Sequence, residues 1–350
     1  MDNVKVSVII TTYGGEWKLK RAIHSILEQS YKNYEIIVVD DNPPKSKARI
    51  RTEEYLKQFV VEEKIKYIKH EYNKNGSAAR NTGIKAACGE YLAFLDDDDY
   101  YLKDRLTVSF KYLEEHSMYD GVCVSVLKLK SGCLAGLVDS SGIMTLTPRD
   151  LIVNQNVLGT GSNIFVRKSL VDSINGFDEK FNRFQDVEFM IRFCEKYKVG
   201  FINQFLIVKD IAGYRVPSYE KIKASLIIFC SKFKNQIDAL EELDKNRFWE
   251  DRFSYLFSLA IQGRNSKTVE EAKNQLKAIR TLSSREKLYA KYFKVLKPLI
   301  QLRKQIAERD IYIVRIYREM KNKKQYSDLI GVLKNDTQIS KAYYYRNMLD

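Results

Sequence analysis

Over the first 100 residues, short apolar runs occur together with apolar side chains at helical spacing. The runs at residues 5–13, 34–41, 65–71 and 91–95 are rich in β-branched and aromatic side chains, which is typical of buried parallel strands. Residues 19–30 instead carry apolar side chains at helical spacing. Strands that alternate with helices predict an α/β fold with a mainly parallel sheet.

The pattern changes twice further along the chain. Residues 118–213 mix strand-like runs with an amphipathic helix at 186–197, which is typical of an α+β arrangement. Residues 219–350 contain few glycines and prolines, and their apolar positions recur at helical spacing. We therefore expect a helical C-terminal region.

Charge divides the chain into two parts at nearly the same point. The 350 residues carry a net charge of +14, from 59 Lys and Arg against 45 Asp and Glu. Residues 1–214 hold 30 basic and 29 acidic residues, so residues 215–350 hold the other 29 and 16 and carry +13. This asymmetry favours an anionic partner for the second part, which would be a membrane surface, a nucleic acid or a polyanionic substrate.

Composition limits the class of protein. No apolar run approaches the roughly 20 residues that a membrane-spanning helix needs, and the N-terminus lacks the basic and small-residue features of a signal peptide. The five cysteines show no CxxC spacing, and the three histidines are scattered. We expect a cytoplasmic protein without a disulfide framework or a zinc site.

Polar side chains follow three of the predicted strands at the point where each strand ends. Residues 11–13 end the first strand, Asp40 and Asp41 the second, and residues 96–99 the fourth. Ligands of open α/β sheets bind outside the carboxyl ends of the strands. The sequence therefore predicts one site built from several strand ends.

The four consecutive aspartates, Asp96 to Asp99, carry the most specific chemistry. A solvated turn, with one acid capping the next helix, accounts for one or two acids but not for four after an apolar strand. Clustered carboxylates relieve their repulsion by protonation or by binding a cation. Mg²⁺ commonly takes one or two carboxylates together with substrate phosphates. A metal–diphosphate site is the functional interpretation, and the solvated turn is the simpler alternative.

The order of four motifs sharpens this interpretation. The stretches VSVIITTY, YEIIVVDD, NGSAARNTGIKAACGEYLAFLDDDD and GFDEKFNRFQDVEFMIR follow one another within residues 4–215. Together they resemble the family-2 glycosyltransferases, which are inverting, nucleotide-sugar-dependent enzymes with a GT-A fold. The resemblance implies a Rossmann-like GT-A catalytic domain at residues 1–215, with a nucleotide-sugar-binding half at 1–100 and an acceptor-side half at 101–215. The basic helical region at 216–350 lies outside the resemblance.

The resemblance places the donor nucleotide on the first strand ends and the loop that follows. Thr11 and Tyr13 match positions that contact the nucleoside, and Asp41 matches an acid that accepts a hydrogen bond from uracil. Gly76 and Arg80 match the family's G…ARN segment, in which the guanidinium suits a diphosphate. The helix that follows is expected to close at Gly89. A core tyrosine at a strand end and a surface arginine are the simpler alternatives.

Within the aspartate run, Asp96 and Asp98 match the family's D-x-D motif. Asp98 is expected to ligate a divalent ion, Mn²⁺ or Mg²⁺, directly. Asp96 is expected to face the ribose or a metal-bound water, and thus to share the metal site. Asp97 is expected to share the contact with the ribose or the sugar, and Asp99 is interpreted as a cap for the helix that residues 101–106 open.

Two further positions complete the implied site. Asp186 matches the family's general base, and the alternative is that it only caps the helix at residues 187–197. Gln185 precedes it where the family often has glutamate. Arg215 lies where the family has a mobile lid, and it is assigned to the diphosphate because a histidine common in that segment is missing.

The resemblance implies transfer of a sugar, with inversion, from a UDP-sugar to a hydroxyl of a glycan or polyprenyl-linked acceptor. Bacterial surface-polysaccharide synthesis is the expected setting. The basic region would attach the enzyme peripherally to the anionic inner face of the cytoplasmic membrane, or would pack as a helical bundle or homodimer interface. Two alternatives stay open: a nucleotidyltransferase acting on sugar phosphates, and a basic nucleic-acid-binding protein. No nucleic acid is expected as a partner, because the sequence shows no RNP, KH or helix-turn-helix signature.

Overall fold

The chain forms two compact units. The first lies within residues 1–131, 136–151 and 155–212, and the second within residues 132–135, 152–154 and 213–350. Arg215 and residues 294–350 lie outside the part of the chain that the structure describes. The computed structural model describes residues 5–14, 16–61, 65–130, 133–140, 142–154, 156–212 and 216–293.

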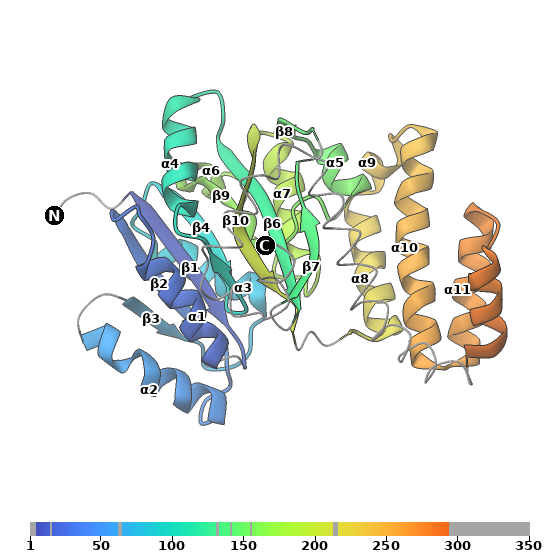
Figure 1. Cartoon of the computed structure of the whole chain (residues 1–350), viewed down its shortest axis with the longest axis horizontal. Helices are drawn as coiled ribbons and strands as arrows, with labels where there is room; N and C mark the ends of the chain where they lie inside the picture. Colours follow the sequence, from blue (N-terminus) through green and yellow to red (C-terminus); the bar gives the residue numbers. More distant parts are fainter. Residues whose placement is uncertain are drawn as a thin grey trace, which may run out of the picture. The chain divides into compact units, whose positions relative to one another are not determined.

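Strands and helices alternate along the chain as far as Asp96 and follow in a mixed order from there to Asp210, and Figure 1 shows the helices arranged around the strands. The strands are β1 (Val6–Thr12), β2 (Tyr34–Asp40), β3 (Ile65–Lys69), β4 (Tyr91–Asp96), β5 (Asp99–Tyr101), β6 (Gly121–Lys130), β7 (Cys133–Val138), β8 (Thr145–Leu146), β9 (Phe165–Arg167) and β10 (Val199–Asp210). The helices are α1 (Glu16–Leu27), α2 (Lys47–Val61), α3 (Gly76–Ala86), α4 (Arg105–Glu115), α5 (Pro148–Val153), the 3₁₀ turn η1 (Gly161–Asn163), α6 (Lys168–Asp172) and α7 (Gln185–Cys194).

One sheet joins the strands in the order β3-β2-β1-β4-β9-β6-β10-β5. The first four strands pair in parallel, as their apolar runs predict. β9 then pairs antiparallel with both β4 and β6. β10 is parallel to β6 and antiparallel to β5. The predicted α/β fold is confirmed, with a parallel first half and a mixed second half.

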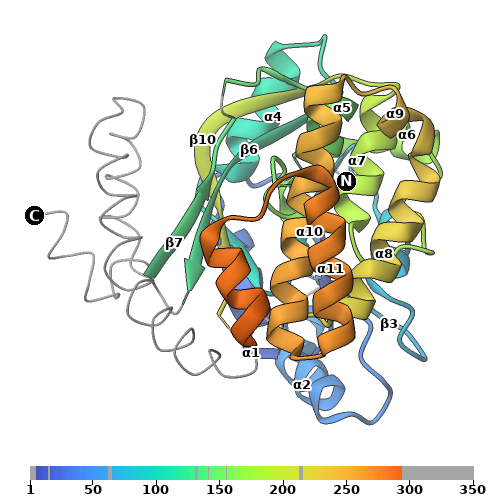
Figure 2. The same ribbon diagram turned by 90° about the vertical axis from the view of Figure 1, so that its right-hand side faces the viewer.

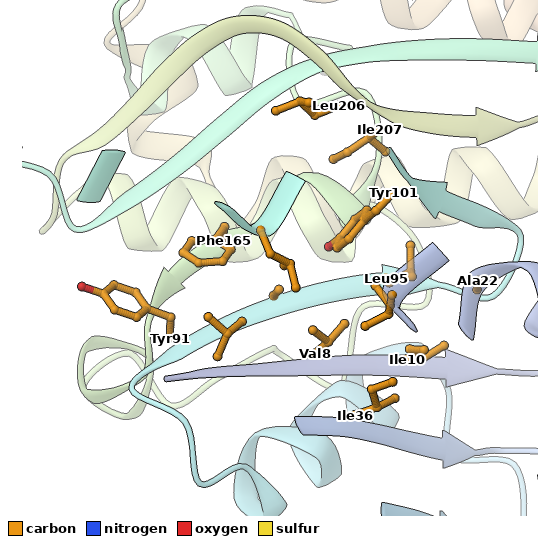
Figure 3. Packing of buried hydrophobic residues seen from close by; sticks show 14 of the residues in the cluster. Val8, Ile10, Ala22, Ile36, Tyr91, Leu95, Tyr101, Phe165, Leu206 and Ile207 are labelled. Carbon is orange, nitrogen blue, oxygen red and sulfur yellow. The ribbon is translucent and has the colours of Figure 1, made fainter. Parts of the chain in front are cut away.

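A continuous apolar core fixes the sheet. Val8 and Ile10 of β1 and Leu95 of β4 are buried in one cluster with Phe165 and Ile207 from the second half (Figure 3). Burying a side chain of this size stabilises the fold by about 1.5–3 kcal/mol. The core therefore holds the carboxyl ends of β1 and β4 beside the second half of the sheet.

Gly89 does not close a helix, contrary to the sequence-based expectation. Helix α3 ends at Ala86, with Ala87 at its C-cap. Gly89 is instead needed for a close approach of two chain segments, because a Cβ there would lie 2.6 Å from the backbone nitrogen of Ser7 and 2.7 Å from its Oγ. The Gly89 amide also donates a 2.8 Å hydrogen bond to that Oγ.

Replacement of Gly89 with alanine is expected to destabilise the protein by about 1–3 kcal/mol. The added methyl group would overlap with the backbone of Ser7, which β1 holds in the sheet. Thermal unfolding followed by circular dichroism measures the change in Tm. Gly263→Ala is the matched control, since a Cβ at that position meets nothing within 4 Å. Equal Tm values for both variants would contradict the close approach at Gly89.

The described part of the second unit is helical from Tyr219 onward, as the periodicity predicts (Figure 2). An apolar core that includes Leu226, Leu256 and Leu276 joins three of its helices. None of the described helices combines the length and the apolar character that crossing a bilayer requires. The helices of the second unit include α8 (Tyr219–Lys232), α9 (Lys234–Asp238), α10 (Glu242–Gly263) and α11 (Ser266–Ile279).

Candidate active site

The predicted strand-end residues lie together at one edge of the sheet. Thr11 of β1 is in register with Asp96 of β4, and Thr12 is in register with Asp40 of β2. The parallel pairing therefore brings the polar ends of three strands side by side. Tyr13 follows β1 directly and its side chain is 62% exposed, so its ring is accessible to a ligand.

Asp97 is tied to the end of β1. Its Oδ2 accepts hydrogen bonds from Thr12 Oγ1 at 2.7 Å and from the Tyr13 amide at 3.2 Å. Burial raises the pKa of Asp97 to about 7, which the Thr12 hydrogen bond opposes and the Asp98 charge reinforces. This carboxylate therefore positions the β1 end that is predicted to hold the nucleoside.

Asp99 lies inside the protein and does not cap a helix, which corrects the sequence-based interpretation. It is the first residue of β5, and helix α4 has Asp104 at its N-cap. Its Oδ2 accepts hydrogen bonds from Thr160 Oγ1 at 2.5 Å and from Ser162 Oγ at 2.7 Å. Burial, followed by the charges of Asp98 and Asp96, raises the pKa of Asp99 to about 7.

Three carboxylates of the run form a group that fits a divalent cation. Ligand oxygens of Asp96, Asp98 and Asp99 all lie within 4.8 Å of one another. Burial and the Asp96 charge raise the pKa of Asp98, while Lys18 opposes this, its Nζ lying 3.7 Å from Asp98 Oδ2. An all-oxygen donor set suits Mg²⁺ or Mn²⁺. A bound cation would relieve the repulsion that these raised pKa values report.

Arg80 connects the aspartate run to α7. Its guanidinium donates to Asp96 Oδ1 at 2.5 Å and to Gln185 Oε1 at 2.8 Å. Gly76 makes this approach feasible, because a Cβ there would lie 2.8 Å from Gln185 Oε1 and 3.2 Å from Arg80 Nη1. The two bonds use two of the five N–H donors of the guanidinium. Arg80 therefore lies at the carboxylate group with donors left for an anion.

Asp186 lies across Gly161 from the aspartate run. A Cβ at Gly161 would lie 3.5 Å both from Asp186 Cβ and from Asp96 Oδ2. Asp186 is the second residue of α7, and the N-cap position belongs to Phe184, whose φ of 59° is left-handed, so the capping alternative for Asp186 is wrong. Within the described residues the Asp186 carboxylate makes no hydrogen bond or ion pair. It is thus available to accept a proton.

Asp41 is more heavily bonded than its predicted role requires. It is buried, and its two oxygens accept hydrogen bonds from the His70 ring and the Asn73 side chain, both at 2.8 Å. They also accept the amides of Lys74 at 2.8 Å and Asn75 at 3.0 Å. A uracil N–H would have to share these oxygens with four existing donors. Asp41 therefore holds the loop before α3, and its contact with uracil stays a prediction.

Sequence reasoning placed residues 159–169 on the acceptor side, but it missed Lys209 of β10 and the hydrogen bonds of Thr160 and Ser162 to Asp99. Lys209 lies opposite Asp99 in the β10–β5 pairing, and its Nζ donates a 3.0 Å hydrogen bond to the Gly159 carbonyl. The available signal was a lysine within the apolar run FLIVKDI. No feature of the turn sequence indicated that its hydroxyl groups donate hydrogen bonds to Asp99.

Lys128 of β6 neighbours Lys209 in the sheet. The buried charge of Lys128 destabilises the folded protein. Burial, reinforced by the Lys209 charge, lowers the pKa of Lys128 to about 8 from 10.5. The folded protein thus binds this proton more weakly than the unfolded chain does, so stability rises with pH between about 8 and 10.5.

Replacement of Lys128 with methionine is expected to raise Tm at pH 7, because it removes a buried charge but keeps the aliphatic volume. The gain in unfolding free energy would be at most about 3 kcal/mol, since a tenfold change in proton affinity corresponds to about 1.4 kcal/mol. The difference from the unsubstituted protein should shrink as the pH approaches 10.5. Thermal unfolding across this range tests it, and a gap in Tm that stays constant with pH would contradict the assignment.

Comparisons with known proteins agree with this geometry. The model of "Glycosyl transferase family 2" matches residues 7–174. An uncharacterized glycosyltransferase of Methanocaldococcus jannaschii, MJ1057, is 32% identical over 230 residues, which cover 62% of this chain and 73% of that protein. The Escherichia coli UDP-Glc:alpha-D-GlcNAc-diphosphoundecaprenol beta-1,3-glucosyltransferase WfgD is 32% identical over 118 residues, which cover 34% of this chain and 44% of that protein. Uncharacterized glycosyltransferases of Rickettsia conorii and Rickettsia felis are 30% and 29% identical, and this chain covers 37% of each.

A solved structure shares the fold. Residues 1–349 of S. aureus TarS, in complex with UDP-GlcNAc, match with a TM-score of 0.54 at 18% identity. The match covers 88% of this chain and 89% of the TarS chain. The common architecture is the GT-A fold followed by a helical region. The chain belongs to glycosyl transferase family 2 and is a glycosyltransferase.

Proposed function

We propose that this glycosyltransferase moves a sugar from a UDP-sugar to a hydroxyl of a glycan or polyprenyl-linked acceptor in surface-polysaccharide synthesis, with inversion at C1. One observation carries the proposal: Asp96, which forms the carboxylate group with Asp98 and Asp99, lies across Gly161 from Asp186, and Asp186 makes no hydrogen bond or ion pair among the described residues. The named activity of the E. coli relative and the UDP-GlcNAc bound to the S. aureus protein support a uridine diphosphate donor.

The nucleoside would lie on the ends of β1 and β2. Tyr13 offers an exposed ring for stacking, and Thr11 lies two residues before it on the same strand. Asp97 accepts the Tyr13 amide and so fixes this strand end, where it would also reach the ribose. Asp41 would share one of its oxygens with the uracil N–H. Together these residues would orient the donor with its diphosphate toward the aspartate run.

The diphosphate would lie between Arg80 and the carboxylate group. Asp98, with Asp96 beside it, would hold a divalent ion, which when bound supplies Lewis-acid neutralisation of the departing diphosphate. Arg80 would add a fixed positive charge, since its guanidinium stays protonated and keeps free N–H donors. Arg215 is assigned to the same diphosphate. These charges would make the nucleoside diphosphate a better leaving group.

Asp186 would act as the general base. As the acceptor oxygen attacks C1, its proton passes to the Asp186 carboxylate, and the bond between C1 and the diphosphate oxygen breaks to release UDP. A single displacement from the face opposite the leaving group inverts the configuration at C1, as in inverting glycosidases. The position of Asp186 across Gly161 from Asp96 supports attack from that face.

A panel of UDP-, GDP- and dTDP-sugars with Mn²⁺ or Mg²⁺ tests the proposed donor class. Thermal shift and donor hydrolysis should single out UDP-sugars, and UDP should be the released product. A nucleotidyltransferase would instead release pyrophosphate from a nucleoside triphosphate and a sugar 1-phosphate, which a separate incubation with these two substrates tests. NMR of the transferred anomeric centre then tests inversion, and a retained configuration would exclude the single displacement.

We further propose that residues 1–215 form the catalytic domain and that the basic region at 216–350 attaches the enzyme to the anionic cytoplasmic face of the membrane. The +13 charge of residues 215–350 supports this, as do Ile227 and Ile228, which are 58% and 44% exposed on α8. Sedimentation of the whole chain with anionic and with neutral liposomes tests it. Equal binding to both would leave a homodimer interface as the alternative, which sedimentation equilibrium measures.

A further inference from the structure

Lys209 is a lysine that the sheet carries into the carboxylate group. It lies in β10 beside Asp210, and the antiparallel pairing of β10 with β5 places it opposite Asp99. Its Nζ donates a 3.0 Å hydrogen bond to the carbonyl of Gly159. The backbone on both sides of this lysine is therefore fixed, and its ammonium is fixed by a carbonyl just before η1.

Carboxylates from three different elements surround this ammonium. Burial alone would lower the pKa of Lys209, but the charges of Asp99, Asp186, Asp96 and Asp98 outweigh it and hold the pKa above its ordinary value. These four acids come from β5, from α7 and from the end of β4 with the turn after it. Lys209 therefore stays charged beside the acid-rich group, with Asp99 opposite it in the sheet.

The ammonium pairs with none of the acids directly. Among the described residues Lys209 makes no ion pair, and its one hydrogen bond is the one to Gly159. An ammonium has three N–H donors. Two of them are left for a ligand that enters among the carboxylates, and an anionic oxygen is the acceptor that a lysine binds best.

The sheet order indicates which end of the donor Lys209 would meet. β10 is separated from β1, with its nucleoside positions, by β4, β9 and β6. Lys209 instead lies opposite Asp99, whose carboxyl group belongs with those of Asp96 and Asp98 to the group where C1 of the sugar and its leaving oxygen would lie. The phosphate bonded to the sugar is the β-phosphate of a UDP-sugar.

We propose that Lys209 is a further donor-binding residue that contacts the β-phosphate of the nucleotide sugar. This inference rests on the proposed UDP-sugar donor. In the free enzyme Lys209 balances the charge of the acids, and in the complex it also binds the β-phosphate. The protein then supplies a positive charge at the leaving group in addition to Arg80.

Calorimetric titration of UDP and UMP, with Mn²⁺ at saturation, tests the contact, because only UDP has a β-phosphate. Lys209→Met is expected to weaken UDP binding about tenfold or more, since a hydrogen bond to a charged group contributes about 1.5–3 kcal/mol. The affinity for UMP should stay within about twofold, and Lys209→Arg should recover part of the UDP affinity. A lysine that only balances the acids would weaken both nucleotides alike.

Lys128→Met is the matched control, since it removes a lysine charge from the neighbouring position on β6. It should leave both affinities unchanged, whereas a general loss of positive charge would weaken UDP binding in both variants. UDP binding by Lys209→Met equal to that of the unsubstituted enzyme would overturn the inference. If the unsubstituted enzyme itself fails to bind UDP, the proposed donor is wrong instead. If Lys209→Met does not fold, Lys209→Gln provides the same comparison of UDP with UMP.

Discussion

Replacement of Asp186 with asparagine is expected to lower kcat for sugar transfer by about a thousandfold, within the 10²–10⁴ range of general-base catalysis. Asparagine keeps the size of the side chain but cannot take a proton from the acceptor hydroxyl. The Asp186 carboxylate makes no hydrogen bond or ion pair among the described residues, so its loss should leave the first turn of α7 intact. Steady-state transfer assays measure kcat, and calorimetry measures the Kd of UDP, which should stay within about twofold.

Asp172→Asn is the matched control for this variant, because Asp172 is an exposed acid at the end of α6. It should transfer sugar at the unsubstituted rate. Near-normal transfer by Asp186→Asn would show that another group removes the proton. Weaker UDP binding together with slower transfer would instead assign Asp186 to donor binding, since a general base acts on the acceptor and not on the nucleotide.

The edge of the sheet at which the site lies is predictable from the sequence. An apolar strand that ends in acids exposes them only at its carboxyl end, and parallel strands bring these ends together. For this reason the sequence predicts that the ends of β1, β2 and β4, with Thr11, Asp40 and Asp96, lie side by side, and the pairing of β1 with β2 and β4 confirms this.

The role of each aspartate in the run depends on contacts with residues that are far away in the sequence. Asp99 looks like a helix cap from its neighbours in sequence, yet Thr160, 61 residues later, binds its carboxylate. The antiparallel strand β9 between β4 and β6 leads to this arrangement, and no local pattern predicts its position in the sheet. Lys209 was missed for the same reason, because the acids whose charges act on it come from β5, α7 and the end of β4 with the turn after it.

Asp41 shows a different limit of prediction from the sequence. Its position after an apolar strand is equally well predicted, but its four hydrogen-bond donors come from residues 70–75. A loop with no apolar periodicity gives no signal of which backbone amides point toward a carboxylate. The sequence therefore identified an acid at the right edge of the sheet without indicating how fully the protein itself already uses it.

Replacement of Asp98 with asparagine is expected to abolish stimulation by Mn²⁺ and to lower transfer by at least about a hundredfold, because it removes a charged ligand from an all-oxygen cation site. Asp98 is the accessible member of the group, with 43% of its side chain exposed, whereas Asp99 is bound by Thr160 and Ser162. Titration of Mn²⁺ in the presence of UDP gives the metal affinity without reference to activity. EDTA should inhibit the unsubstituted enzyme, and Mn²⁺ should restore it.

Asp97→Asn separates metal binding from charge when the pH is well above 7, since Asp97 is then ionised and the variant removes one carboxylate charge a single residue away. The Asp97 carboxylate accepts Thr12 Oγ1 and the Tyr13 amide and lies outside the group of three carboxylates that fits a cation. We expect this variant to keep more of the Mn²⁺ affinity than Asp98→Asn does, because it leaves all three carboxylates of the group in place, while its UDP affinity falls. Equal losses of Mn²⁺ affinity in both variants would mean that the run acts through its total charge. A normal response of Asp98→Asn to Mn²⁺ and EDTA would show that Asp98 is not the metal ligand.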